Sequence, residues 1–125
     1  AFLEEDLLVD ISQEELTGIA TELVEGGDPE PIASTIEEQV QKVEDYTLRW
    51  AVPELRLKRL TRPLVLWELY KRLGSIPEKR QKAYDEAMKE LVAIRDGKFP
   101  DLAIQEPAPE GAPGATGAWG SEEQL

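Results

Sequence analysis

The spacing of apolar residues between Pro31 and Pro53 constrains the fold more than any other feature of the sequence. Apolar side chains and one threonine recur there every three or four positions, at Ile32, Ile36, Val40, Val43, Tyr46, Thr47 and Trp50. Because an α-helix completes a turn in about 3.6 residues, this spacing gathers them on one face. The residue before a proline is driven out of helical geometry, so we expect a long amphipathic helix that closes at Pro53.

Two shorter elements are expected before this helix. Residues 3–8 predict a short helix or turn. Ser12 and Glu15 form a capping box, in which each side chain bonds the backbone N–H of the other residue, and this predicts the start of a helix. That helix ends in the Gly-Gly-Asp-Pro run at residues 26–29, because a proline there cannot continue it.

The most buried helix is expected in the second half of the chain. Thr61 with Pro63 just inside is typical of a helix start, and apolar residues up to Leu73 cover most of its circumference. Gly74 suits a left-handed cap at its end. The basic segment before it, residues 55–60, fits either a short extended piece or a helical turn.

A last helix is expected to follow Gly74 and to end at Gly97. Ser75 and Glu78 form a second capping box around Pro77. Apolar residues from Tyr84 onward are expected to face the core. The charged side chains expected to face solvent are Lys79, Arg80, Lys82, Glu86 and Lys89.

The composition changes after Pro100 and divides the chain in two. Proline, glycine, alanine and glutamate dominate beyond this point, and such a sequence cannot form a packed core. The predicted fold is therefore all-α: a compact bundle of about four to five helices over residues 1–104, with a flexible acidic C-terminal tail over residues 105–125. Trp119 stands alone in this tail, and we interpret it as an anchor for a partner.

The residue types available argue against an enzyme. The chain has no cysteine and no histidine, which removes thiol nucleophiles, imidazole bases and the usual zinc ligands. No glycine-rich phosphate loop is present in the sequence. Acidic clusters such as residues 4–6 lack the spaced ligands of a calcium loop, so we interpret them as solvated faces. We therefore expect no catalytic residue, cofactor or metal, and no membrane span.

Charge is distributed unevenly along the sequence. Residues 1–50 carry fourteen acids and two bases, residues 51–100 carry seven acids and twelve bases, and residues 101–125 carry five acids and no base. An acidic and a basic surface on one molecule favour head-to-tail contact between copies. A solvated charge pattern without a partner is the alternative.

The basic segment is also the one candidate for contact with nucleic acid. It comprises Arg56, Lys58, Arg59, Arg62, Lys71, Arg72, Lys79, Arg80 and Lys82. A chain of net charge −12 is repelled by DNA over most of its surface, so an acidic protein partner is favoured. Passive contact with DNA, for instance beside a channel, stays open.

The order of these segments resembles a known family, the small helical head–tail connector or head-completion proteins of Mu-like tailed phages and prophages. The resemblance covers residues 2 to about 104. It is carried by Glu5-Asp6-Leu7, by the acidic glycine loop Gly26-Gly27-Asp28, by Tyr46-Thr-Leu-Arg-Trp-Ala-Val-Pro53 and by the helix around Tyr84-Asp85 that ends near Gly97. The acidic first half and the long tail depart from the usual pattern of the family.

The resemblance implies a structural virion protein without catalytic residues. Copies are expected to assemble in the host cytoplasm and to form or join a ring in the virion neck, between the portal protein and the next neck or tail protein. A ring closes through heterologous contacts, which an acidic and a basic side suit. The alternative is an acidic cytoplasmic binding module that sequesters a basic partner.

The proposed ring contact names specific residues. Glu37, Glu38, Glu44 and Asp45 of one copy are expected to meet Arg56, Lys58, Arg59 or Arg62 of the next. Trp50 closes the acidic helix, and we interpret it as a partly exposed interface residue, with Trp119 as a second.

Overall fold

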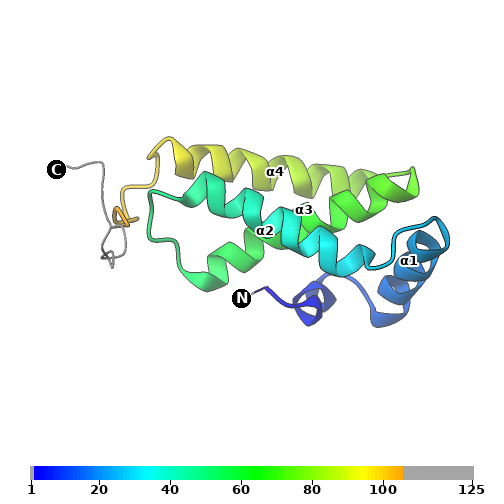
Figure 1. Cartoon of the computed structure of the whole chain (residues 1–125). Coiled ribbons are helices and arrows are strands. Elements are labelled where there is room, and N and C mark those ends of the chain that lie inside the picture. Colours follow the sequence, from blue (N-terminus) through cyan, green and yellow to red (C-terminus); the bar gives the residue numbers. More distant parts are fainter. Residues whose placement is uncertain (1, 106–125) are drawn as a thin grey trace, which may run out of the picture.

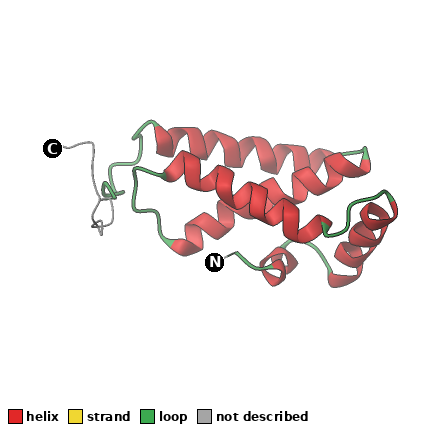
Figure 2. Cartoon of the chain, viewed as in Figure 1, coloured by secondary structure: helices red, strands yellow, loops and turns green. Residues whose placement is uncertain are grey.

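The computed structural model describes residues 2–105, which form helices joined by loops (Figure 2). The elements are a 3-10 helix η1 (Glu4–Val9) and the α-helices α1 (Gln13–Glu25), α2 (Pro31–Thr47), α3 (Glu54–Leu73) and α4 (Glu78–Arg95). Within residues 2–105 there is no strand, and one isolated β-bridge joins Trp50 to Ile104. The predicted all-α bundle is confirmed.

Helix α3 lies at the centre of the bundle. It contacts α1, α2, α4 and η1, whereas α1 and η1 pack mainly on α2 and α3. In Figure 1, α2 and α4 run along the length of the molecule, and α1 lies across one end. The last described residues, from residue 99 onward, lie at the opposite end, beside the end of α2.

The core has two parts, and α3 contributes to both. One part joins η1, α1 and α2 to Val65, Leu66 and Leu69 of α3. The other joins α2 and α4 to Leu60 and Leu64 of α3. Leucines therefore point from α3 to opposite sides, which explains why its apolar residues surround the helix as the sequence predicts.

The start of α3 differs from the prediction. The helix begins at Glu54 rather than near Thr61, so the undecided segment 55–60 is helical and Pro63 lies inside the helix. An internal proline costs about 3 kcal/mol through its missing N–H and its clash with the preceding turn. Here the burial of the neighbouring Leu64 and Val65, both fully covered, offsets that cost.

The end of α2 also differs from the prediction. The helix ends at Thr47 rather than at Pro53. Residues 49–51 instead lie antiparallel to residues 103–105: the N–H of Ala51 donates to the carbonyl of Ala103 at 2.8 Å, and the N–H of Gln105 donates to the carbonyl of Arg49 at 2.8 Å. These pairings occur between positions more than fifty residues apart, so no local pattern reveals them.

The two predicted capping boxes have different outcomes. Ser12 caps α1, because its Oγ accepts the N–H of Glu15 at 3.1 Å, although the carboxylate of Glu15 bonds Tyr70 instead of completing the box. Ser75 does not cap α4, where Pro77 is the capping residue and makes no side-chain hydrogen bond. Gly74 has a φ of 99°, so the predicted left-handed cap of α3 is confirmed.

This difference between the two serines gives a matched test. We expect Ser12→Ala to lower the free energy of unfolding by about 1 kcal/mol, because it leaves a backbone N–H of α1 without its cap. Ser75→Ala should stay within about 0.5 kcal/mol of the parent chain. Urea denaturation followed by circular dichroism measures both. Equal losses would contradict the assignment of Ser12 as the cap.

The predicted tail lies almost entirely outside the described residues. Residue 1 and residues 106–125, which include Trp119, are not described. The predicted flexibility of this segment, the domain boundary at residue 104 and the role of Trp119 therefore remain predictions.

Candidate interaction sites

The bases of α3 pair with acids from the first half of the same chain. Lys58 Nζ lies 3.3 Å from Asp6 Oδ2, and Arg62 Nε lies 3.3 Å from Asp10 Oδ2. Because α3 packs against η1, the acidic and basic halves of the sequence meet inside one molecule. Folding thus neutralises part of the charge asymmetry seen along the sequence.

Arg72 extends this neutralisation to the other end of α3. Its guanidinium lies 3.2 Å from Asp28, 2.7 Å from Glu38 and 3.4 Å from Glu68. These three carboxylates belong to the α1–α2 loop, to α2 and to α3 itself. One arginine therefore connects three parts of the bundle.

Arg56 and Arg59 both pair with Glu90 of α4. The carboxylate of Glu90 accepts hydrogen bonds from Arg59 at 2.8 Å and from Arg56 at 3.0 Å. The hydrogen bond from Arg59 is the main reason why the pKa of Glu90 lies below its ordinary value of 4.5, while partial burial opposes this shift. The pair of arginines fixes α4 against the first half of α3.

This lowered pKa predicts how stability depends on pH. A carboxyl group whose pKa is lower in the folded chain stabilises it above the unfolded pKa, and the contribution is lost as pH falls through the folded pKa. We expect the parent chain to lose more stability than Glu90→Gln below pH 4.5. Chemical denaturation at several acidic pH values measures this. Glu86→Gln, at an exposed position of α4, is the control and should follow the parent chain.

The predicted ring contact involves residues of two kinds. Arg56, Lys58, Arg59 and Arg62 all have carboxylate partners in their own chain. The acidic residues Glu37, Glu38, Glu44 and Asp45 are all exposed on α2, but Glu38 bonds Arg72 and Asp45 accepts a hydrogen bond from Gln41. A contact between these two groups would require the bases to exchange partners, and it stays a prediction.

Three exposed apolar side chains lie at the end of the bundle where α2 ends and α3 begins. Leu48 is 71% exposed, Leu55 is 82% exposed and Ile104 is 64% exposed. We call these residues the apolar end. The adjacent Trp50 is half-buried and packs against the second core cluster, and its Nε1 is covered and has no hydrogen-bond partner among residues 2–105. Exposed apolar groups that gather in one place are typical of interaction sites.

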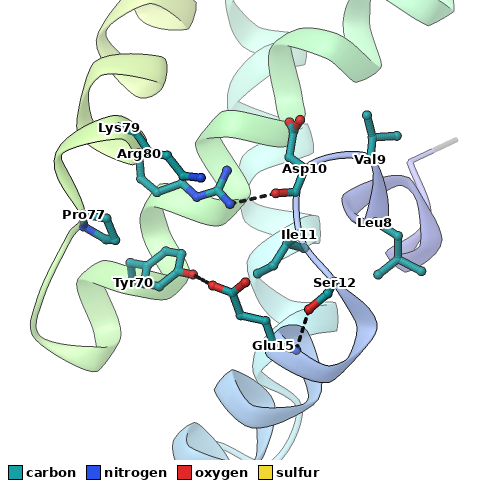
Figure 3. A pocket seen from close by; sticks show the side chains of 10 residues that line it. All are labelled: Leu8, Val9, Asp10, Ile11, Ser12, Glu15, Tyr70, Pro77, Lys79 and Arg80. Atoms are coloured by element: carbon teal, nitrogen blue, oxygen red, sulfur yellow. Dashed lines mark hydrogen bonds between the residues drawn. The ribbon is translucent and has the colours of Figure 1, made fainter.

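A pocket of about 400 Å³ lies at the other end, between the N-terminal segment and the start of α4. Figure 3 shows Arg80 and Tyr70 facing Asp10 and Glu15 across it. Arg80 is predicted to face solvent, and this prediction is wrong: the side chain is 9% exposed, and its Nη2 donates to the carbonyl of Asp10 at 2.8 Å. The connection between η1 and α1 covers it.

One comparison with known proteins decides which family the chain belongs to. The family model described as Bacteriophage Mu, Gp36 matches residues 3–118. The chain belongs to the phage Mu Gp36 family. No curated protein and no solved structure matches the chain.

Membership of the phage Mu Gp36 family confirms that the chain belongs to a family of Mu-like phage proteins, as the resemblance implies. The match continues past residue 105 into the acidic segment, to residue 118. Part of the Pro/Gly-rich segment is therefore included in the sequence that the family shares. Within residues 2–105, no helix is long and apolar enough to cross a membrane.

Proposed function

We propose that this phage Mu Gp36-family chain is a structural, non-enzymatic protein of the virion neck. It forms or joins a ring between the portal and the tail of a phage. Family membership is the observation that carries the proposal, because it connects a small helical bundle with phage assembly. The order of the sequence segments, which resembles head–tail connectors, supports the specific position in the neck.

The apolar end supports a role in assembly. Burying a leucine or isoleucine side chain that is otherwise exposed stabilises a contact by about 1.5–3 kcal/mol. Leu48, Leu55 and Ile104 together offer this contribution at one end of an elongated bundle. An end that binds a partner suits a subunit that joins the component above it to the component below it.

The exposed charges support a contact with a neighbouring copy. Glu37 and Glu44 on α2 have no hydrogen-bond or ion-pair partner among residues 2–105. On α4, Lys82 and Lys89 are exposed and also have no hydrogen-bond or ion-pair partner among residues 2–105. The acids and the lysines lie on different helices of one bundle. The α2 acids of one copy can therefore meet the α4 lysines of the next copy, which suits a heterologous contact in a ring.

The proposal is tested in the phage or prophage that encodes the chain. We expect phage that lack the protein to accumulate DNA-filled heads and separate tails, visible by electron microscopy. Supplying the protein in trans should restore joined particles. Normal infectious particles in its absence, or empty heads without packaged DNA, would contradict a role in the neck.

A further inference from the structure

An apolar groove lies between the second half of α2 and the start of α3. Its volume is about 280 Å³, and its apolar lining consists of Phe2, Val40, Val43, Val52 and Leu57. Val43 is buried, whereas the other four are only half-buried and are accessible from outside. Pockets for cofactors and other small molecules usually measure about 300–1,000 Å³, so this groove suits a side chain of a partner protein better. We call it the α2 groove.

The charged residues of the α2 groove leave one carboxylate unpaired. Glu44, Glu54 and Lys58 line its rim. Lys58 Nζ lies 3.3 Å from Asp6 and 3.9 Å from Glu54, so its charge is compensated within the chain. Glu44 is exposed and has no hydrogen-bond or ion-pair partner among residues 2–105. An apolar side chain with a base beside it would therefore complement both the lining and the rim.

The end of α2 presents this combination. Leu48 is 71% exposed, and the guanidinium of the exposed Arg49 has no partner among residues 2–105. Leu55 also precedes an arginine, but Arg56 is bonded to Glu90. The other exposed large apolar residues of the described part have no lysine or arginine next to them in the sequence: Leu3, Leu8, Val9, Val24 and Ile104. Among residues 2–105, the Leu48–Arg49 segment therefore fits the α2 groove best.

The Leu48–Arg49 segment cannot occupy the groove of its own copy in this fold. Leu48 keeps helical dihedral angles, with φ −54° and ψ −36°, so it lies one turn beyond Glu44 on the same side of α2 and remains exposed. The carbonyl of Arg49 accepts the N–H of Gln105 at 2.8 Å, which holds the segment in place. A second copy can therefore receive it without rearrangement of the backbone.

We propose that two copies pair through a two-fold contact at this end of the bundle. Leu48 of each copy enters the α2 groove of the other copy, and Arg49 of each copy pairs with Glu44 of the other. The segment and the groove lie side by side on one surface, and a two-fold axis brings such a surface against itself, so that each contact occurs twice. The contact goes beyond the proposed function, because it is separate from the heterologous contact in the ring.

The pair should be weak and reversible. The groove and the segment form a small surface, so we expect pairing at micromolar concentrations and above, and separate copies below them. Pairing covers Leu48 in the concentrated protein and leaves the apolar end open to a partner in the dilute protein. Glu37 and the exposed lysines of α4 stay available in the pair.

Sedimentation equilibrium of the full chain over a range of concentrations tests the proposal. We expect the mass of the parent chain to rise from 14.0 kDa to twice this value. Glu44→Arg and Arg49→Glu should each weaken pairing by about thirtyfold, because each places two pairs of like charges at the contact. The double variant Glu44→Arg, Arg49→Glu should pair as the parent chain does, and so should an equal mixture of the two single variants.

Glu22→Arg is the matched control, because Glu22 is an exposed glutamate of α1 away from the groove. Glu22→Arg and Glu44→Arg change the net charge of −12 by the same amount toward zero, which reduces general repulsion between copies. Weaker pairing of Glu44→Arg alone therefore reports a specific contact. Circular dichroism should show the same helix content in all variants, since an arginine near the end of α2 suits the helix dipole.

Four outcomes would overturn the proposal. A mass of 14.0 kDa at every concentration would show that the copies do not pair. Equal pairing of Glu44→Arg and Glu22→Arg, or a double variant that pairs no better than the single variants, would remove the Glu44–Arg49 contact. Particles that grow beyond two chains through these residues would show a heterologous contact instead. A dimer alone does not support the neck function, and its absence does not contradict that function, which the phage experiment tests separately.

Discussion

Replacing Leu69 by alanine is expected to lower the free energy of unfolding by about 2–5 kcal/mol, which is a large part of the stability of a domain of this size. Leu69 is 0% exposed and lies on α3, where it packs among residues of η1, α1 and α2. The substitution removes buried methyl groups and leaves a cavity at the centre of the bundle. Urea denaturation at neutral pH measures the loss.

Leu55→Ala is the matched control on the same helix. Leu55 is 82% exposed, so its truncation should change the free energy of unfolding by no more than about 0.5 kcal/mol. A loss for Leu69→Ala as small as that for Leu55→Ala would show that α3 is not the central helix of the core.

Replacing Leu48 and Leu55 together by serine is expected to weaken binding to the portal by about thirtyfold without unfolding the chain. Both side chains belong to the apolar end and are mostly exposed, so they contribute little to folding. If the portal covers about half of each side chain, their loss costs about 2 kcal/mol of binding free energy, which corresponds to this factor. Titration of purified portal with labelled protein measures the affinity.

The control for this binding experiment changes two exposed apolar residues elsewhere. Leu3 is 52% exposed and Val24 is 49% exposed, and both lie in the N-terminal part of the chain. The Leu3→Ser, Val24→Ser variant should bind as the parent chain does. Equal affinity for both double variants would remove the apolar end from the binding surface.

Local patterns in the sequence predict most helices but not their exact ends. The apolar stripe from Ile32 to Val43 predicts α2 because a single helix face meets the core, and Gly74 predicts the end of α3 because glycine alone adopts a positive φ without strain. Trp50 continues the helical spacing yet lies outside α2, since residues 49–51 pair with residues 103–105. Pro63 suggests a helix start, and only packing on both sides of α3 explains why it lies inside.

The candidate sites were harder to predict because they depend on tertiary contacts. The uneven distribution of charge can be read from the sequence. The pairing of Lys58 and Arg62 with acids of the first half cannot, because it depends on the packing of α3 on η1. Arg80 lies on the charged stripe of α4, and nothing in the helical spacing shows that the η1–α1 connection covers it.

The mass of the full chain in solution, measured by light scattering alone and with purified portal at low and at high salt, tests the connector function most directly. The proposed function predicts either rings with a mass that is a multiple of 14.0 kDa or binding of several copies to the portal. Contacts that involve exposed carboxylates should weaken as salt rises, because salt screens exposed charges. A protein that stays at 14.0 kDa in every condition and does not bind the portal would contradict the account and favour an acidic binding module.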